Sequence, residues 1–169
     1  EAGDGVGAAA SRQRPSYQLI TGTPPYFPLD SFVASPNHPQ KVRCRMPTRG
    51  RATEYIAAAS RLLHTPEEPP GGGIFVMVEA AFATAEAAVL AAVVQYQMTV
   101  LRRVDVVTRC GLAPRFSCWV MTTTTNHNTT NSPFPVEIFT LRDSNLKRTN
   151  EYTRAMEAMG WVDFEKYKD

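Results

Sequence analysis

Short apolar runs alternate along the chain with segments of helical periodicity, and this alternation most constrains the fold. An apolar run at 17–21 precedes a helical pattern at 53–63, and a second apolar run at 73–79 precedes an Ala-rich helical stretch at 80–98. The order strand, helix, strand, helix is typical of α/β proteins, in which helical crossovers join parallel strands. We therefore expect an α/β sheet with parallel strands.

The second half of the chain is richer in β-formers. Runs at 100–108 and 116–123 predict an antiparallel hairpin that closes a sheet edge, 136–141 predicts a further strand, and 149–159 predicts a short helix. Residues 1–16 are rich in Gly, Ala, Ser and Arg and show no periodicity, which indicates a flexible lead-in. We therefore expect residues 17–169 to form the folded part, as one domain.

Composition excludes several classes of protein. The chain has 169 residues, of which 43% are apolar and 20% charged, with a net charge of +2, so it is neither a disordered nor a collagen-like chain. Glu86 interrupts the richest apolar stretch, so a membrane span is not expected. The three cysteines and three histidines lack the spacing of metal ligands, which predicts no metal site and free thiols in a reducing compartment, the cytoplasm.

The segment that carries chemistry directly follows the first apolar run, which is typical of a buried strand. It reads Thr23-Pro24-Pro25-Tyr26-Phe27, and open α/β sheets place their sites just past the carboxyl ends of strands. Two prolines remove two N–H donors, so the loop offers mainly acceptors, which suits an amino group, and the aromatic rings offer faces on which a planar group could stack. The alternative is a structural turn whose aromatic side chains pack into the core.

This segment resembles the catalytic loop of S-adenosylmethionine-dependent amino-methyltransferases, which reads Asn, Asp or Ser followed by Pro-Pro-Tyr or Pro-Pro-Phe. It is most similar to bacterial tRNA adenine methyltransferases that act next to the anticodon of a valine tRNA. The similarity extends loosely over residues 17–160, and its further segments lie at 49–63, 72–76, 102–104, 111–120 and 141–152. The resemblance implies the C-terminal part of a Rossmann-like methyltransferase sheet with an antiparallel closing hairpin.

The resemblance also implies S-adenosylmethionine as cofactor. The family places its Gly-rich cofactor motif on strands before the catalytic loop, and no Gly-x-Gly-x-x-Gly occurs in this chain. Ala2-Gly3-Asp4 is similar to the Gly-Asp that precedes the catalytic strand, which would give Asp4 a contact with the cofactor adenine; alternatively, Asp4 belongs to a loose tail. We therefore expect the chain to begin near the end of the cofactor-binding half, and to be inactive alone.

In the mechanism that the resemblance implies, the Thr23 side chain and the Pro24 carbonyl accept hydrogen bonds from the acceptor amino group, and Tyr26 stacks on the base. Position 23 is Thr where Asn, Asp or Ser is usual, so a different acceptor or a lost activity stays open. Replacing Pro24 with Ala is expected to abolish transfer with little loss of folding.

A basic segment follows the Pro-Pro loop. It holds five cations and no acid within eleven residues: Lys41, Arg43, Arg45, Arg49 and Arg51. With Phe27, residues Arg43, Arg45 and Arg49 are candidates for binding a nucleic-acid substrate, because phosphates attract clustered cations; a solvated basic loop is the alternative.

These features together predict methyl transfer to an amino nitrogen, with adenine in tRNA as the leading acceptor. A protein glutamine or another amide is the second enzymatic possibility. A non-catalytic RNA-binding or scaffold module is the alternative outside enzymes.

Overall fold

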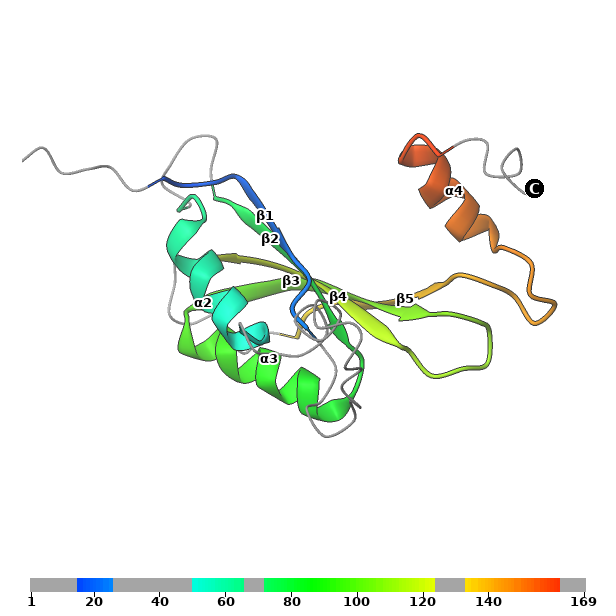
Figure 1. The fold of residues 1–169 in the computed structure, drawn as a ribbon, viewed down its shortest axis with the longest axis horizontal. Coiled ribbons are helices and arrows are strands. Elements are labelled where there is room, and N and C mark those ends of the chain that lie inside the picture. The colour runs from blue at the N-terminus through cyan, green and yellow to red at the C-terminus, as the bar shows by residue number, and fades with distance from the viewer. Residues whose placement is uncertain (1–14, 26–49, 66–71, 124–132, 162–169) are drawn as a thin grey trace, which may run out of the picture.

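The computed structural model describes residues 15–25, 50–65, 72–123 and 133–161. Their strands form one sheet in the order β1-β2-β4-β3-β5, drawn in Figure 1. The elements, in chain order, are β1 (Leu19–Gly22), α2 (Ala52–Leu62), β2 (Ile74–Ala80), α3 (Ala83–Gln95), β3 (Met98–Val107), β4 (Phe116–Thr123), β5 (Val136–Thr140) and α4 (Asn150–Ala158).

The sheet is mixed. β1 pairs with β2 and β3 pairs with β5 in parallel, whereas β4 is antiparallel to both β2 and β3. The expected α/β class and the β3–β4 hairpin are confirmed. The hairpin does not close the edge, however, because β5 pairs with the outer side of β3 and takes the edge position.

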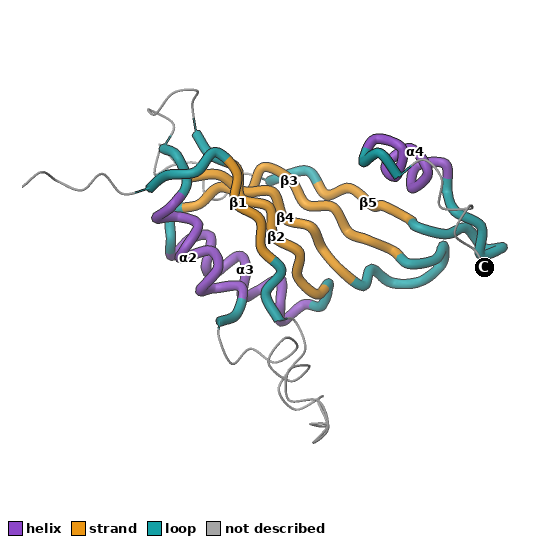
Figure 2. Tube along the Cα trace, turned by 45° about the horizontal axis from the view of Figure 1, so that its top comes forward, coloured by secondary structure: helices purple, strands orange, loops and turns teal. Residues whose placement is uncertain are grey.

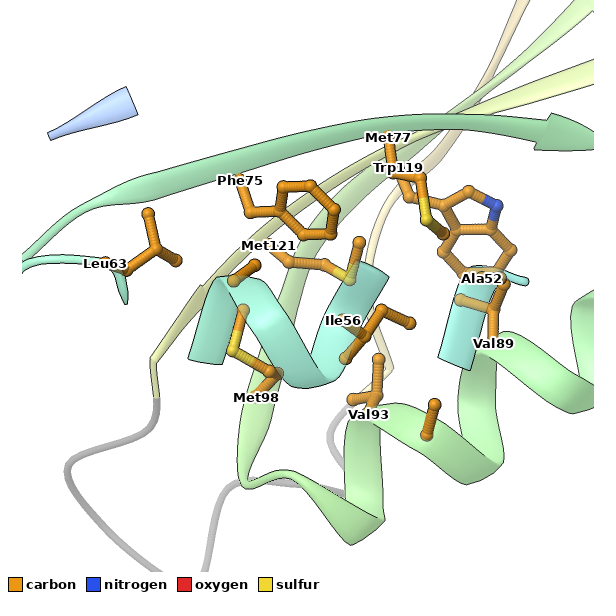
Figure 3. Close-up of a cluster of buried hydrophobic side chains, with 12 residues drawn as sticks. Ala52, Ile56, Leu63, Phe75, Met77, Val89, Val93, Met98, Trp119 and Met121 are labelled. Carbon is orange, nitrogen blue, oxygen red and sulfur yellow. The ribbon is translucent and has the colours of Figure 1, made fainter. Parts of the chain in front are cut away.

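Two helices cover one face of the sheet. In Figures 1 and 2, α2 and α3 lie side by side on the same side of β1, β2, β3 and β4. Their buried faces follow the helical spacing of their apolar residues, which periodicity predicts. Figure 3 shows the core between these layers; its largest fully buried side chains are Trp119, Phe75, Ile56, Met77, Met98, Met121 and Val89.

Tight backbone packing joins the end of α2 to β1 and β2. The N–H of Tyr17 donates to the Leu62 carbonyl (2.8 Å), and the N–H of Gly73 donates to the His64 carbonyl (2.9 Å). A Cβ at Gly73 would lie 2.6 Å from the Tyr17 carbonyl oxygen. Only glycine allows this approach, so Gly73 fixes the point at which β2 enters the sheet.

The expectation that the first strand is buried is wrong. β1 is an edge strand of the described sheet, and Leu19 is 61% exposed. Alternate side chains of a strand point to opposite faces, and only Ile20 among the apolar residues of β1 packs against the core. The apolar run thus predicted the strand correctly, but it did not predict whether one face or both faces of the strand are buried.

The last helix lies apart from the other two. α4 packs beside β5, where the rings of Tyr152 and Phe139 meet edge to face at 6.4 Å. Thr149 begins the helix, because its hydroxyl oxygen accepts a hydrogen bond from the Tyr152 N–H (3.1 Å). Figure 2 shows α4 next to the β5 edge, away from α2 and α3.

Candidate functional site

The Pro-Pro loop leaves the sheet at the carboxyl end of β1. Thr23 is exposed, Pro24 is fully buried and Pro25 is half-buried. Because β1 runs parallel to β2 with Gly22 opposite Met77, the loop starts beside the carboxyl end of β2. The buried Pro24 ring holds the backbone in place, while the preceding Thr23 side chain is presented to solvent.

The burial of Pro24 revises one expectation. A buried proline contributes packing as well as a fixed φ, so replacement by Ala leaves a void and removes a restraint on the unfolded chain. Folding is therefore affected along with any activity. Thr23 is the cleaner position at which to test chemistry, because its side chain is exposed.

Tyr55 on α2 packs against the chain on both sides of the segment 26–49. A Cβ at Gly22 would lie 2.7 Å from Tyr55 Cδ1, and a Cβ at Gly50 would lie 3.7 Å from Tyr55 Cε2. Gly50 has a φ of 132°, which favours glycine. The helical pattern at 53–63 and the resemblance at 49–63 both include Tyr55 but give it no contact with this loop, although glycines such as Gly22 and Gly50 often mark a close approach to the backbone.

Glu79 lies at the carboxyl end of β2 and is 95% buried, since its exposed fraction is 5%. The Ala80 N–H donates to Glu79 Oε1 (2.8 Å). Burial raises the pKa of this carboxyl group, and the Ala80 hydrogen bond offsets only part of the rise. Sequence reasoning treated Glu79 only as the end of a strand and gave it no role.

An ion network lies next to Glu79 on the same face of the sheet. Arg103 pairs with Asp105 (2.9 Å) and with Glu86 at the start of α3 (2.7 Å). The Ser117 hydroxyl donates to the other Asp105 oxygen (2.7 Å). Burial by itself lowers the pKa of Arg103, but its hydrogen bonds and charge interactions with Asp105 and Glu86 outweigh burial and raise it.

The ring of Trp119 packs against the guanidinium group of Arg103. The Arg103 guanidinium carbon lies 5.2 Å from the centroid of the Trp119 ring, which is cation–π distance. The indole Nε1 is buried and has no hydrogen-bond partner. In Figure 3 this nitrogen lies on the side of the ring nearer the arrowhead of β2. A buried donor without a partner is uncommon in folded proteins.

Several candidate residues fall outside the described part of the chain. They are Asp4, Tyr26, Phe27, Arg43, Arg45 and Arg49. Of the site residues inferred from the sequence, the structure thus places Thr23, Pro24 and Pro25. It also places Arg51, which is exposed immediately before α2, where its N–H donates to Glu54 Oε2 (2.7 Å).

The described residues form neither a metal cluster nor a membrane-spanning helix. No group of three or more His, Cys, Asp or Glu side chains there is arranged to hold a metal ion. None of the described helices combines the length and hydropathy that crossing a bilayer requires.

Two free thiols lie in the described part of the chain. Cys110 is exposed, and Cys118 is half-buried. Burial raises the pKa of the Cys118 thiol, an effect that the charge of Arg102 partly offsets.

The described residues can form the acceptor side of a methyl-transfer site, but they do not form a cofactor cradle. Among them, no glycine-rich turn follows a strand into a helix, and Asp4, the residue assigned to the cofactor, is not among them. Within the described ranges, the Thr23–Pro25 loop is thus the one candidate for lining the site that S-adenosylmethionine would occupy.

No family model matches the chain, and no curated protein matches it. Similar solved structures include a predicted O-methyltransferase from Agrobacterium tumefaciens, with 12% identity and a TM-score of 0.46 over 66% of this chain and 48% of that one. A modification subunit of a predicted type I restriction enzyme from Vibrio vulnificus has 11% identity and a TM-score of 0.44, over 86% of this chain and 31% of that one. The chain thus spans less than half the length of either. Similarities at this level assign neither a family nor an activity.

Proposed function

We propose that this chain belongs to an enzyme that transfers a methyl group from S-adenosylmethionine to an amino nitrogen, with adenine in RNA as the acceptor. One observation carries the proposal. At the carboxyl end of a parallel strand, an exposed Thr23 hydroxyl precedes a fully buried Pro24. This arrangement presents acceptors on a rigid backbone, at the place where α/β sheets bind ligands.

The loop acts by positioning the amino group. The Thr23 hydroxyl oxygen and the Pro24 carbonyl each accept a hydrogen bond from one N–H of the acceptor, which turns the nitrogen lone pair toward the methyl group. S-adenosylmethionine supplies that methyl on a sulfonium, so alignment matters more than proton transfer. Pro24 and Pro25 fix two φ angles, so little loop entropy is lost when the acceptor is aligned.

The proposed substrate is a tRNA in the cytoplasm. Arg43, Arg45 and Arg49 would bind its phosphates, and Tyr26 and Phe27 would stack on the base, which must first leave its own stack. These assignments are based on the sequence, since all five residues lie outside the described ranges.

Three variants of the full-length protein test the role of Thr23. Thr23→Val keeps the side-chain shape but removes the hydroxyl, so transfer should fall about tenfold or more, the worth of one hydrogen bond of about 1.4 kcal/mol. Thr23→Ser should retain more activity than Thr23→Val. Thr21→Val is the matched control, because Thr21 is an exposed threonine of β1, two residues before Thr23, and has no role in the proposal.

The assay follows labelled methyl into RNA and into protein in parallel. Incorporation into RNA adenine that Thr23→Val reduces supports the proposal, whereas equal turnover in the wild type and Thr23→Val contradicts the role of Thr23. Label that enters only protein favours the amide acceptor. RNA binding without any transfer favours the non-catalytic module.

A further inference from the structure

Glu79 reaches the same edge of the sheet as the Pro-Pro loop. β1 and β2 pair in parallel from Leu19 opposite Ile74 to Gly22 opposite Met77. Continuing both strands by two residues brings the chain to Pro24 and to Glu79. The Ala80 N–H, which donates to Glu79 Oε1, holds the carboxyl group beside the following peptide, at the carboxyl end of β2.

The polar neighbours of Glu79 have other partners. Ser117 lies directly opposite Glu79 in the β2–β4 ladder, but its hydroxyl hydrogen goes to Asp105. Arg103, on β3 beyond β4, is shared by Asp105 and Glu86. Among the described residues, the Ala80 N–H is therefore the one donor to the Glu79 carboxyl group, a group that can accept about four hydrogen bonds.

Such a carboxyl group is costly unless something else donates to it. Removing a carboxylate from water without hydrogen bonds disfavours its charged form, and the raised pKa of Glu79 agrees with this. The Trp119 Nε1–H, which is buried and has no hydrogen-bond partner among the described residues, lies on the same face, two residues from Ser117 along β4. This end of the sheet thus holds both an acceptor and a donor with unused capacity.

We propose that Glu79 is a specificity-determining residue whose carboxyl group shares one hydrogen of the exocyclic amino group of an adenine acceptor with the Pro24 carbonyl, in a three-centre hydrogen bond at the Thr23–Pro25 loop. This inference rests on the proposed function and names the group that selects its substrate. An amino group donates two hydrogens and accepts almost none, so it matches a site whose free groups are a carboxyl, a hydroxyl oxygen and a carbonyl. A base that carries a keto oxygen at the same place would meet acceptors only.

Binding of small nucleosides to the full-length protein tests the inference directly. Adenosine is compared with purine riboside, which lacks the amino group, and with inosine, which carries a keto oxygen there. We expect the wild type to bind adenosine about tenfold to a hundredfold more tightly than either, the range for one hydrogen bond to a charged group. In Glu79→Leu this preference should fall by about tenfold, to the part that the Thr23 hydroxyl and the Pro24 carbonyl contribute.

Two further variants provide a partial rescue and a matched control. Glu79→Gln retains a carbonyl acceptor, so it should restore part of the preference for adenosine, and it serves if Glu79→Leu does not fold. Glu137→Leu is the matched control, because Glu137 is a carboxylate of the same sheet but is exposed on β5, and it should keep the full preference. Folding of each variant is checked by thermal unfolding.

The outcomes separate this inference from the proposed function. An unchanged adenosine preference in folded Glu79→Leu or Glu79→Gln overturns the role of Glu79, even if methyl transfer occurs. A wild type that does not distinguish adenosine from purine riboside also overturns it. A preference that depends on Glu79, in a protein that transfers no methyl group to RNA, supports the binding role and refutes the enzymatic one.

Discussion

The ring of Tyr55 occupies the space that a side chain at Gly22 would need, because a Cβ there would lie 2.7 Å from Tyr55 Cδ1. This contact joins α2 to the end of β1, one residue before the Thr23 loop. The contact therefore fixes the position of the strand end from which the loop of the proposed acceptor site extends.

Gly22→Ala should destabilise the protein by about 1–3 kcal/mol, the usual cost of overpacking a core. The ring of Tyr55 has to move, because the added Cβ would also lie 3.4 Å from Phe75 Cε2 and cannot shift toward that ring. Chemical denaturation measures the loss. In a Tyr55→Leu background the same substitution should cost less, because the obstructing ring is gone; equal costs in the two backgrounds would rule out this contact as the cause.

Arg103→Met should destabilise the protein by about 3–5 kcal/mol, because Asp105 would stay buried without its cation. Arg102→Met is the matched control on the same strand. Its ion pair with Glu137 is long, at 3.7 Å, and both side chains are more than half exposed, so less than about 1 kcal/mol should be lost. Similar losses in the two variants, measured by urea denaturation, would contradict a structural role for the Arg103 network.

The pH dependence of stability should report the burial of Glu79. Its pKa is raised on folding, so the folded state holds the proton more tightly than the unfolded state. The contribution of Glu79 is therefore fully retained below the unfolded pKa of about 4.3 and is lost as pH rises through the folded pKa.

Glu79→Gln should remove this dependence while leaving the neighbouring charges of Arg103, Asp105 and Glu86 in place. The stability of the variant relative to the wild type should then increase from about pH 4 toward neutral pH. Denaturation curves across this range measure the difference. A constant difference at every pH would show that Glu79 does not titrate differently in the folded and unfolded states.

Replacing Arg43, Arg45 and Arg49 together with Ala should weaken RNA binding and reduce its salt dependence. Each phosphate contact with single-stranded RNA contributes about 0.7 to the slope of log affinity against log salt, so three contacts predict a change of about 2. Binding titrations at several salt concentrations measure the slope. A wild-type affinity that is independent of salt would refute the phosphate-binding role of this segment.

The sequence predicted the elements of this protein closely because local signals define them. Helical spacing located α2, and the apolar run before the Ala-rich stretch located β2. The order of the elements gave the α/β class. The Pro-Pro motif likewise made Thr23 and Pro24 candidate site residues, because the motif is a local sequence pattern that does not depend on tertiary contacts.

Tertiary structure alone decided which residues those elements bring together. β5 pairs with the outer side of β3, which places the hairpin inside the sheet, and no local pattern specifies which strands become neighbours. Glu79 was an unremarkable acid at a strand end until the register placed it opposite Ser117, whose hydroxyl already donates to Asp105. The sequence thus determined which groups are present and the approximate extent of each element, although the helix expected at 80–98 covers only Ala83–Gln95. Whether a polar group has a partner depends on contacts between segments far apart in the chain, so only the folded structure could show that Glu79 is left with unused acceptor capacity.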